Sequence, residues 1–169
     1  MSETKIDYAF AEITFSKEIK DCFSKIVKDI VPEKALYYSP VIERIKGDMT
    51  NTLHCTLFYG LNPNLINDSS LNNLLIEANI EVVKLGKLFF IDGYQGLYKV
   101  LCIEVIDYDK SLSILSEKIY QFAKNVKYEF KPHLTLAYVT SDYKFPEDLT
   151  EIRKEIKVSK VKISRNLDL

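Results

Sequence analysis

The sequence has 169 residues, 47% of them hydrophobic and 28% charged, which are the proportions of one soluble globular domain. Its net charge of −1 argues against a broad basic surface for long nucleic acids or an anionic membrane, but it allows a pocket for a small charged ligand. No apolar run approaches membrane-spanning length, and the opening residues, MSETKIDYAF, lack a secretion-signal pattern. Cys22, Cys55 and Cys102 have no metal-ligand spacing, so we expect reduced, buried thiols and a cytoplasmic protein.

The first third of the chain predicts a strand, a helix and a loop. Residues 6–15 are rich in aromatic and β-branched residues, as in a strand. Residues 16–30 have apolar side chains at helical spacing, with Ser16 as the expected N-cap and Pro32 beyond the end. Residues 33–52 predict a loop with a short strand around Val41. On the first strand, one face should carry Ala9, Ala11, Ile13 and Phe15, and the other Tyr8, Phe10, Glu12 and Thr14.

The order strand, helix, strand occurs twice along the chain, over 6–15, 16–30 and 53–59 and again over 98–106, 109–125 and 133–139. A strand over 53–59 is followed by the Asn-rich turn NPNLINDSS and a short helix, then by strands over 80–91 and 98–106 joined by DGYQG. A helix over 109–125 with Asp109 as its cap, a strand over 133–139 and a final strand near 156–164 complete the chain. We therefore expect one α+β domain over 1–169 with two pseudo-symmetric lobes, approximately 6–60 and 87–140. Antiparallel sheets should form a concave groove with helices packed outside.

The chain has two histidines, His54 in LHCTLFYG and His133 in KPHLTLAYV, and each stands two residues before a threonine. A single histidine on an apolar strand is usually a half-buried residue with a satisfied hydrogen bond. Two such histidines in the same His-x-Thr frame, each on a predicted strand at the same place in a repeat, make coincidence a poor explanation. The two motifs are therefore the candidate functional residues.

Alternate side chains of a strand share a face, so each histidine should lie on the same face as its threonine. The first face would then hold His54, Thr56 and Phe58, and the second His133, Thr135 and Ala137. The opposite faces, with the leucines and Tyr138, would pack into the core. This alternation turns Cys55 away from His54 and argues against a cysteine nucleophile.

Paired histidines suit acid–base catalysis at a phosphodiester. A neutral imidazole can take a proton from the attacking oxygen while a protonated one gives a proton to the leaving oxygen. A neighbouring threonine hydroxyl can donate to a non-bridging phosphate oxygen. Two histidines are too few for a catalytic zinc site, which normally has three protein ligands, so we expect no metal and no cofactor.

HCTL and HLTL, about eighty residues apart, resemble the paired HxT motifs of the 2H phosphoesterase superfamily, and the resemblance covers roughly residues 6–165. That superfamily includes 2′-5′ RNA ligase-like proteins, cyclic nucleotide phosphodiesterases and phage anti-CBASS nucleases. The form HxTLxYG, with a tyrosine in the first strand, looks closest to the anti-CBASS enzymes, which cleave cyclic oligonucleotides without metal. The resemblance implies that His54, Thr56, His133 and Thr135 are catalytic.

The expected activity is metal-independent cleavage of 3′-5′ linkages in cyclic di- or trinucleotide messengers, in the host cytoplasm if a phage encodes the protein. The alternatives are processing of RNA ends, on 2′,3′-cyclic phosphates or 2′-5′ links, and a nucleotide-binding sponge without catalysis. Tyr8 resembles a base-stacking aromatic of the anti-CBASS proteins, and Phe10 shares its face; ordinary core packing is the alternative role for either residue. Candidate phosphate-binding cations are Lys131, Arg44 and Lys46. The sequence predicts no long nucleic acid or membrane partner and does not specify an oligomeric state.

Overall fold

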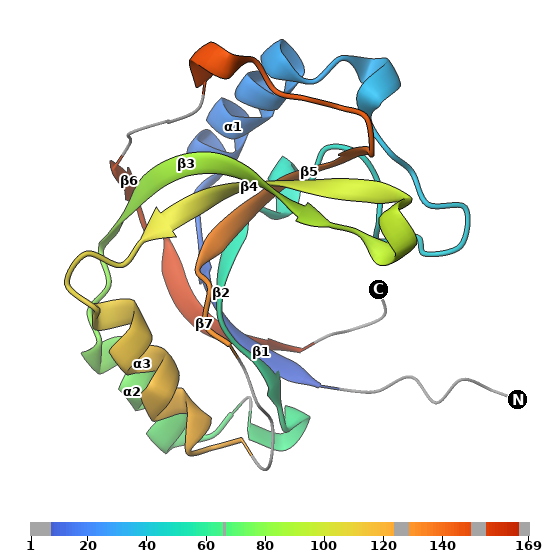
Figure 1. The fold of residues 1–169 in the computed structure, drawn as a ribbon. Helices are drawn as coiled ribbons and strands as arrows, with labels where there is room; N and C mark the ends of the chain where they lie inside the picture. Colours follow the sequence, from blue (N-terminus) through green and yellow to red (C-terminus); the bar gives the residue numbers. More distant parts are fainter. Residues whose placement is uncertain (1–7, 66, 124–128, 150–154, 166–169) are drawn as a thin grey trace, which may run out of the picture.

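A computed structural model describes residues 8–65, 67–123, 129–149 and 155–165. Their strands form one antiparallel seven-stranded sheet in the order β6-β3-β4-β5-β2-β1-β7 (Figure 1). The pseudo-symmetric halves meet at the centre of this sheet, where β5 lies beside β2. The strands are β1 (Ala9–Thr14), β2 (His54–Leu61), β3 (Val82–Asp92), β4 (Tyr98–Ile106), β5 (His133–Thr140), β6 (Glu155–Lys157) and β7 (Lys160–Arg165).

The sheet is strongly curled, and the last two strands show why. β6 pairs with β3 at one edge and β7 pairs with β1 at the other, although only two residues separate them. Because three residue steps span at most about 11 Å, the two edges must come close together. The linking residues hydrogen-bond both edges: Val158 donates its amide to Glu81 and Ser159 to Thr14. The sheet is therefore a half-barrel with a concave face.

The helices pack on the outer side of this sheet (Figure 1). α1 (Lys17–Ile30) contacts β5, α3 (Ser111–Tyr120) contacts β2, and α2 (Ser69–Glu77) contacts β7 and α3. The Ser16 hydroxyl accepts a hydrogen bond from the Ile19 amide at 3.3 Å, which confirms the predicted N-cap. The expected α+β fold with a concave sheet and external helices is confirmed.

Both motif strands contain a β-bulge that simple alternation did not predict. Leu57 is an extra residue opposite β1, and Leu136 is an extra residue opposite β4. After each bulge the faces exchange, so Phe58 and Ala137 are buried in the core. The predicted placement of these two residues beside the histidines was wrong. Their neighbours Tyr59 and Tyr138 take that face instead, opposite Phe10 and Val100.

Several other expectations change. The single strand expected near 156–164 is the pair β6 and β7 at opposite edges of the sheet. Val41 is 88% exposed and does not form the expected short strand. The isolated backbone β-bridges of residues 33–52 are made instead by Leu36, Tyr38, Lys46 and Asp48. Cys22 is exposed on α1 instead of buried.

The helix expected over 109–125 begins later than its cap residue suggested. Asp109 accepts a hydrogen bond from the Ser111 amide, but Asp107 supplies the larger part of the cap by accepting from the amides of Leu112 and Ser113. The helix ends at Tyr120, and residues 124–125 of the expected range lie outside the described residues.

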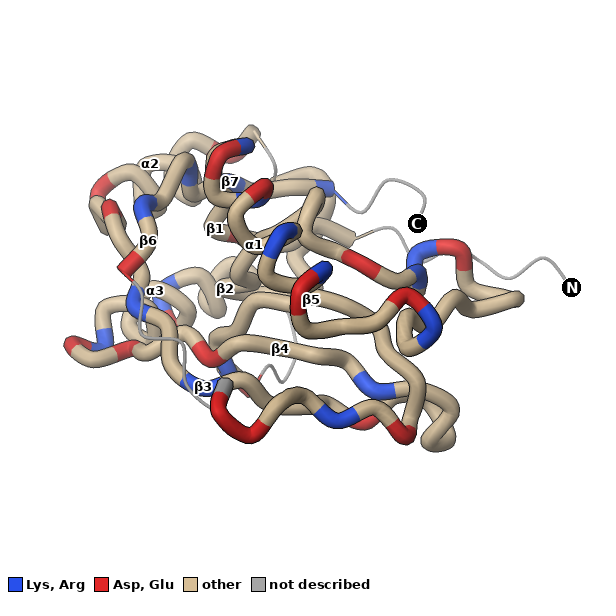
Figure 2. The backbone as a smooth tube through the Cα atoms, turned by 90° about the horizontal axis from the view of Figure 1, so that it is seen from above, with Lys and Arg blue, Asp and Glu red and all other residues tan. Residues whose placement is uncertain are grey.

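Lysines and arginines are interspersed with acidic residues along the described backbone (Figure 2). Among the described helices, none is both long and apolar enough to cross a bilayer.

Candidate active site

The two motif strands touch at the centre of the sheet, where Cys55 pairs with Leu134. In an antiparallel pair, this register sets His54 opposite Thr135 and Thr56 opposite His133. Side chains directly opposite are about 5 Å apart at Cβ, and diagonal neighbours such as the two histidines about 7–8 Å apart. Two histidines and two threonines from distant parts of the chain thus form one square on the concave face.

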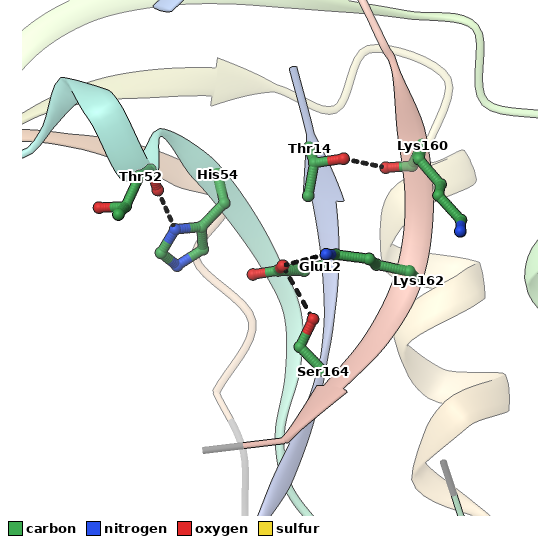
Figure 3. A network of polar contacts seen from close by, with 7 residues as sticks. All are labelled: Glu12, Thr14, Thr52, His54, Lys160, Lys162 and Ser164. Carbon is green, nitrogen blue, oxygen red and sulfur yellow. Dashed lines mark hydrogen bonds and ion pairs between the residues drawn. The ribbon is translucent and has the colours of Figure 1, made fainter. Parts of the chain in front are cut away.

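Each histidine ring is held by the same backbone hydrogen bond. Nδ1 of His54 lies 2.7 Å from the carbonyl oxygen of Thr52 (Figure 3), and Nδ1 of His133 lies 2.7 Å from that of Lys131. A carbonyl oxygen can only accept, so Nδ1 carries the proton in both rings. In the neutral form, Nε2 is then the unprotonated nitrogen, and it is directed away from the backbone. Either ring can accept a proton at Nε2 or, once protonated, donate it.

An aromatic side chain flanks each histidine. The rings of Phe10 and His54 have centroids 6.2 Å apart, and those of Phe89 and His133 lie 6.1 Å apart with an edge-to-face geometry. The sequence placed Phe10 on the same strand face as Tyr8 but did not predict its contact with His54. Phe89 was missed because it lies on β3, which is separated from β5 by β4.

The buried thiols beside the motifs are not activated. Burial raises the pKa of Cys55 to about 12, although the His133 amide opposes this shift. Burial also raises the pKa of Cys102 to about 12, opposed by a hydrogen bond to the Thr135 side chain. Both thiols are therefore protonated at neutral pH, which agrees with the argument against a cysteine nucleophile.

A carboxylate and a lysine lie on the concave face of β1 and β7, next to the first motif. Glu12 is opposite Thr56 and only 8% exposed. Its Oε1 accepts a hydrogen bond from Ser164 Oγ at 3.0 Å and lies 3.9 Å from Lys162 Nζ (Figure 3). Lys162, which is partly exposed, was not among the cations selected from the sequence. The sequence did not indicate this lysine, because the pairing of the final strand could not be predicted.

The predicted substrate-binding residues fall in three places. Tyr8 and Phe10 lie on the concave face, where both contact Tyr59. Lys131 contributes its carbonyl to the His133 ring, while its exposed ammonium lies 3.3 Å from Glu129. Its predicted phosphate contact stays a prediction. Arg44 is exposed, and its positive charge acts on the nearby Tyr138 phenol. Lys46, in the same segment, forms an isolated backbone β-bridge with Tyr38.

Within the described part of the chain, no three His, Cys, Asp or Glu side chains gather closely enough to hold a metal ion. The square offers two imidazoles and two hydroxyls, and its hydroxyls and protonated ring nitrogens can donate hydrogen bonds to an anion. What it can do chemically is hold a phosphate between two groups that transfer protons.

Comparisons with known proteins identify the fold. No protein-family model matches the sequence, and no curated protein matches it significantly. TT0787 of Thermus thermophilus is 15% identical over 92% of this chain and 86% of its own, with a TM-score of 0.61. E. coli LigT complexed with NADP+ is 15% identical over 94% and 87%, with a TM-score of 0.62. A structure described as a phosphoesterase is also 15% identical, over 95% and 88%, with a TM-score of 0.60. The chain shares the fold of these proteins.

We predict that only Cys22 reacts rapidly with a thiol reagent in the folded protein. The raised pKa of Cys55 and Cys102 leaves almost no thiolate at pH 8, and both thiols are buried. An absorbance assay should show one fast-reacting thiol, and the other two only after unfolding. The Cys22→Ser variant is the control and should show none while folded. Rapid labelling of that variant would contradict the assigned chemistry of the buried thiols.

Proposed function

We propose that the protein is a metal-independent phosphodiesterase that cleaves a small nucleotide by two-histidine acid–base catalysis. One observation carries this proposal: two histidines from pseudo-symmetric strands meet at one strand pairing, each with Nδ1 on a backbone carbonyl 2.7 Å away. This arrangement leaves two Nε2 atoms for proton transfer on the same concave face. The fold shared with LigT and a phosphoesterase supports the proposal.

A 3′-5′-linked ribonucleotide carries its own nucleophile in the 2′-hydroxyl beside the phosphate. One histidine takes the proton of this hydroxyl at Nε2 as the oxygen bonds to phosphorus. The bond from phosphorus to the 5′ oxygen breaks, and the other histidine, protonated at Nε2, gives its proton to that oxygen. The products are a 2′,3′-cyclic phosphate and a free 5′-hydroxyl, and hydrolysis of the cyclic phosphate can follow.

The threonines are placed to stabilise the charge on the phosphate. Each hydroxyl lies across the strand pair from the opposite histidine, so a phosphate between the rings can accept a hydrogen bond from Thr56 and another from Thr135. Lys162 on the same face supplies a positive charge near Glu12. Negative charge that develops on the non-bridging oxygens is thereby matched by fixed donors.

The leading substrate is a cyclic di- or trinucleotide messenger, in a role like that of the anti-CBASS enzymes. The near-neutral charge supports a compact substrate over long RNA, which needs many basic contacts. LigT has been crystallised with 3′-AMP, ATP, NADP+ and phosphate, so this fold accommodates nucleotides. The likeness to LigT also favours a second candidate, an RNA-end-processing enzyme of the 2′-5′ ligase-like type. A sponge would need no matched acid and base.

We predict that His54→Ala and His133→Ala each lower kcat by about 10²- to 10⁴-fold, because each ring makes a separate proton transfer. Thr56→Val and Thr135→Val should cost less, since the acid and base remain. Rates with a cyclic dinucleotide, with products identified by mass, measure this.

Circular dichroism spectra of the variants control for folding. A histidine variant with nearly wild-type turnover would contradict the mechanism. Stoichiometric capture of the nucleotide by the wild-type protein, without product, would identify a sponge.

We also predict that activity persists in EDTA and that kcat/KM passes through a maximum with pH. One histidine must be neutral and the other protonated, so the rate falls when either group changes state. Rates at matched ionic strength across the pH range, with and without chelator, test both statements. Loss of activity in EDTA that zinc or magnesium restores would contradict the proposal.

A further inference from the structure

Two aromatic clusters lie on the concave face, one at each end of the motif square. The first platform consists of Tyr8, Phe10 and Tyr59, and the second of Tyr37, Tyr98 and Tyr138. We propose that these platforms stack the two bases on either side of one scissile phosphodiester. The substrate would then be a compact nucleotide with an internal linkage rather than a terminal 2′,3′-cyclic phosphate. This inference rests on the proposed function and specifies its substrate class.

The platforms are related by the repeat that relates the histidines. The bulges at Leu57 and Leu136 turn the fifth residue after each histidine, Tyr59 or Tyr138, onto the concave face. Without the bulge, each tyrosine would point into the core on the helix side. The same local irregularity therefore delivers one aromatic ring per motif strand to the face that holds the catalytic square.

The antiparallel pairing of β2 and β5 sends the two tyrosines in opposite directions from the square. Tyr59 is three residues beyond Thr56, and Tyr138 is three residues beyond Thr135. Because each stretch includes the bulge residue, it spans only two residue steps of the partner strand, Phe10 to Glu12 or Val100 to Cys102, which is about 7 Å. This separation is comparable to the span of one nucleotide. A phosphate in the square thus has one aromatic platform within reach on each side.

Contacts within the first platform are direct. The rings of Tyr8 and Tyr59 have centroids 4.4 Å apart, and those of Phe10 and Tyr59 are 6.1 Å apart at an angle of 28°. Tyr59 remains 42% exposed. Phe10 also contacts the His54 ring, so the platform is continuous with the catalytic square.

The second platform is assembled from three segments. Tyr37 and Tyr98 stack with centroids 5.0 Å apart at 23°, and Tyr98 meets Tyr138 at 5.6 Å. Tyr37 is fixed by donating its amide to the Tyr138 carbonyl at 2.9 Å. A side chain at Gly93 would put its Cβ 2.4 Å from the Tyr98 ring, so glycine is required there to seat that ring.

All three tyrosines of the second platform are half-buried rather than enclosed, which leaves ring surface accessible to a ligand. Burial raises the pKa of the Tyr138 phenol, with Tyr98 adding to the shift and the positive charge of Arg44 opposing it. The phenol therefore stays neutral at physiological pH. The exposed Arg44 is the nearby cation that a flanking phosphate can meet, as in a cyclic nucleotide with a second linkage.

Two platforms distinguish the candidate substrates. An internal phosphodiester has a nucleoside on each side, so both bases can stack, whereas a nucleoside 2′,3′-cyclic phosphate has one base and leaves one platform unused. Stacking on an aromatic side chain strengthens binding by about 5- to 150-fold for each base. The arrangement therefore favours two-base substrates.

The test compares kcat/KM for a 3′-5′ dinucleoside monophosphate, its two singly abasic forms and a nucleoside 2′,3′-cyclic phosphate. In Tyr98→Leu, the kcat/KM of the two-base substrate relative to the abasic form that lacks the base of the second platform should fall about 5- to 150-fold, because that abasic form does not respond to the substitution. Tyr59→Leu should give the same fall, with the other abasic form as the one that does not respond. Tyr98→Phe keeps the stacking surface and should preserve the ratio. Tyr94→Leu, at a 66% exposed position in the β3–β4 turn, is the matched control.

If Tyr98→Leu leaves the ratio of two-base to one-base kcat/KM unchanged, or lowers kcat/KM equally for every substrate, the two-platform proposal is overturned. Tyr98 would then serve only in packing. Faster opening of the 2′,3′-cyclic phosphate by wild-type protein would overturn it too, while leaving two-histidine catalysis intact. Failure to cleave any of these substrates would instead count against the proposed function.

A second measurement does not depend on the folding of tyrosine variants. In the inactive His54→Ala protein, the dinucleoside monophosphate should shift the ring NMR signals of both Tyr59 and Tyr98. A mononucleotide should shift one platform only. Signals of the second platform that stay unchanged at saturation would contradict the proposal.

Discussion

The single pairing of Cys55 with Leu134 is the constraint on which the site depends. The two motifs lie about eighty residues apart, and this contact between β2 and β5 places them side by side. Its antiparallel register decides that each histidine faces the threonine of the other motif. It also decides that the strands leave the square in opposite directions. The geometry of the square and the positions of the two aromatic platforms thus both follow from one register.

The backbone hydrogen bonds to Nδ1 fix the orientation and the tautomer of both histidine rings. A histidine that can rotate or exchange tautomers presents either nitrogen to a substrate, whereas a ring fixed by a carbonyl presents Nε2 alone. Because Thr52 and Lys131 make the same contact, the two halves are chemically equivalent as far as the rings are concerned. The surroundings differ: Glu12 with Lys162 lies beside Thr56, while Cys102 lies beside Thr135. Such differences can give the two histidines the separate acid and base roles that we propose.

Much of the fold could be predicted because hydrophobic periodicity is local. β4 was expected over the range in which it occurs, the strand of Ala9, Ala11 and Ile13 was correct, and Ser16 caps α1 as expected. The bulges could not be predicted, since an extra residue is defined by the partner strand and not by the chain that contains it. Tyr59 and Tyr138 were therefore assigned to the wrong environment or overlooked. The division of the tail into β6 and β7 likewise depends on how far the whole sheet curls.

The most direct test of the account is a leaving-group experiment. In a 3′-5′ dinucleotide whose bridging 5′ oxygen is replaced by sulfur, the leaving group departs without needing a proton. The variant that lacks the general acid should then recover most of its lost rate, and the variant that lacks the base should not. We therefore expect one of His54→Ala and His133→Ala to be rescued selectively by the sulfur substrate. Equal rescue of both variants, or of neither, would contradict a mechanism in which the two histidines transfer different protons.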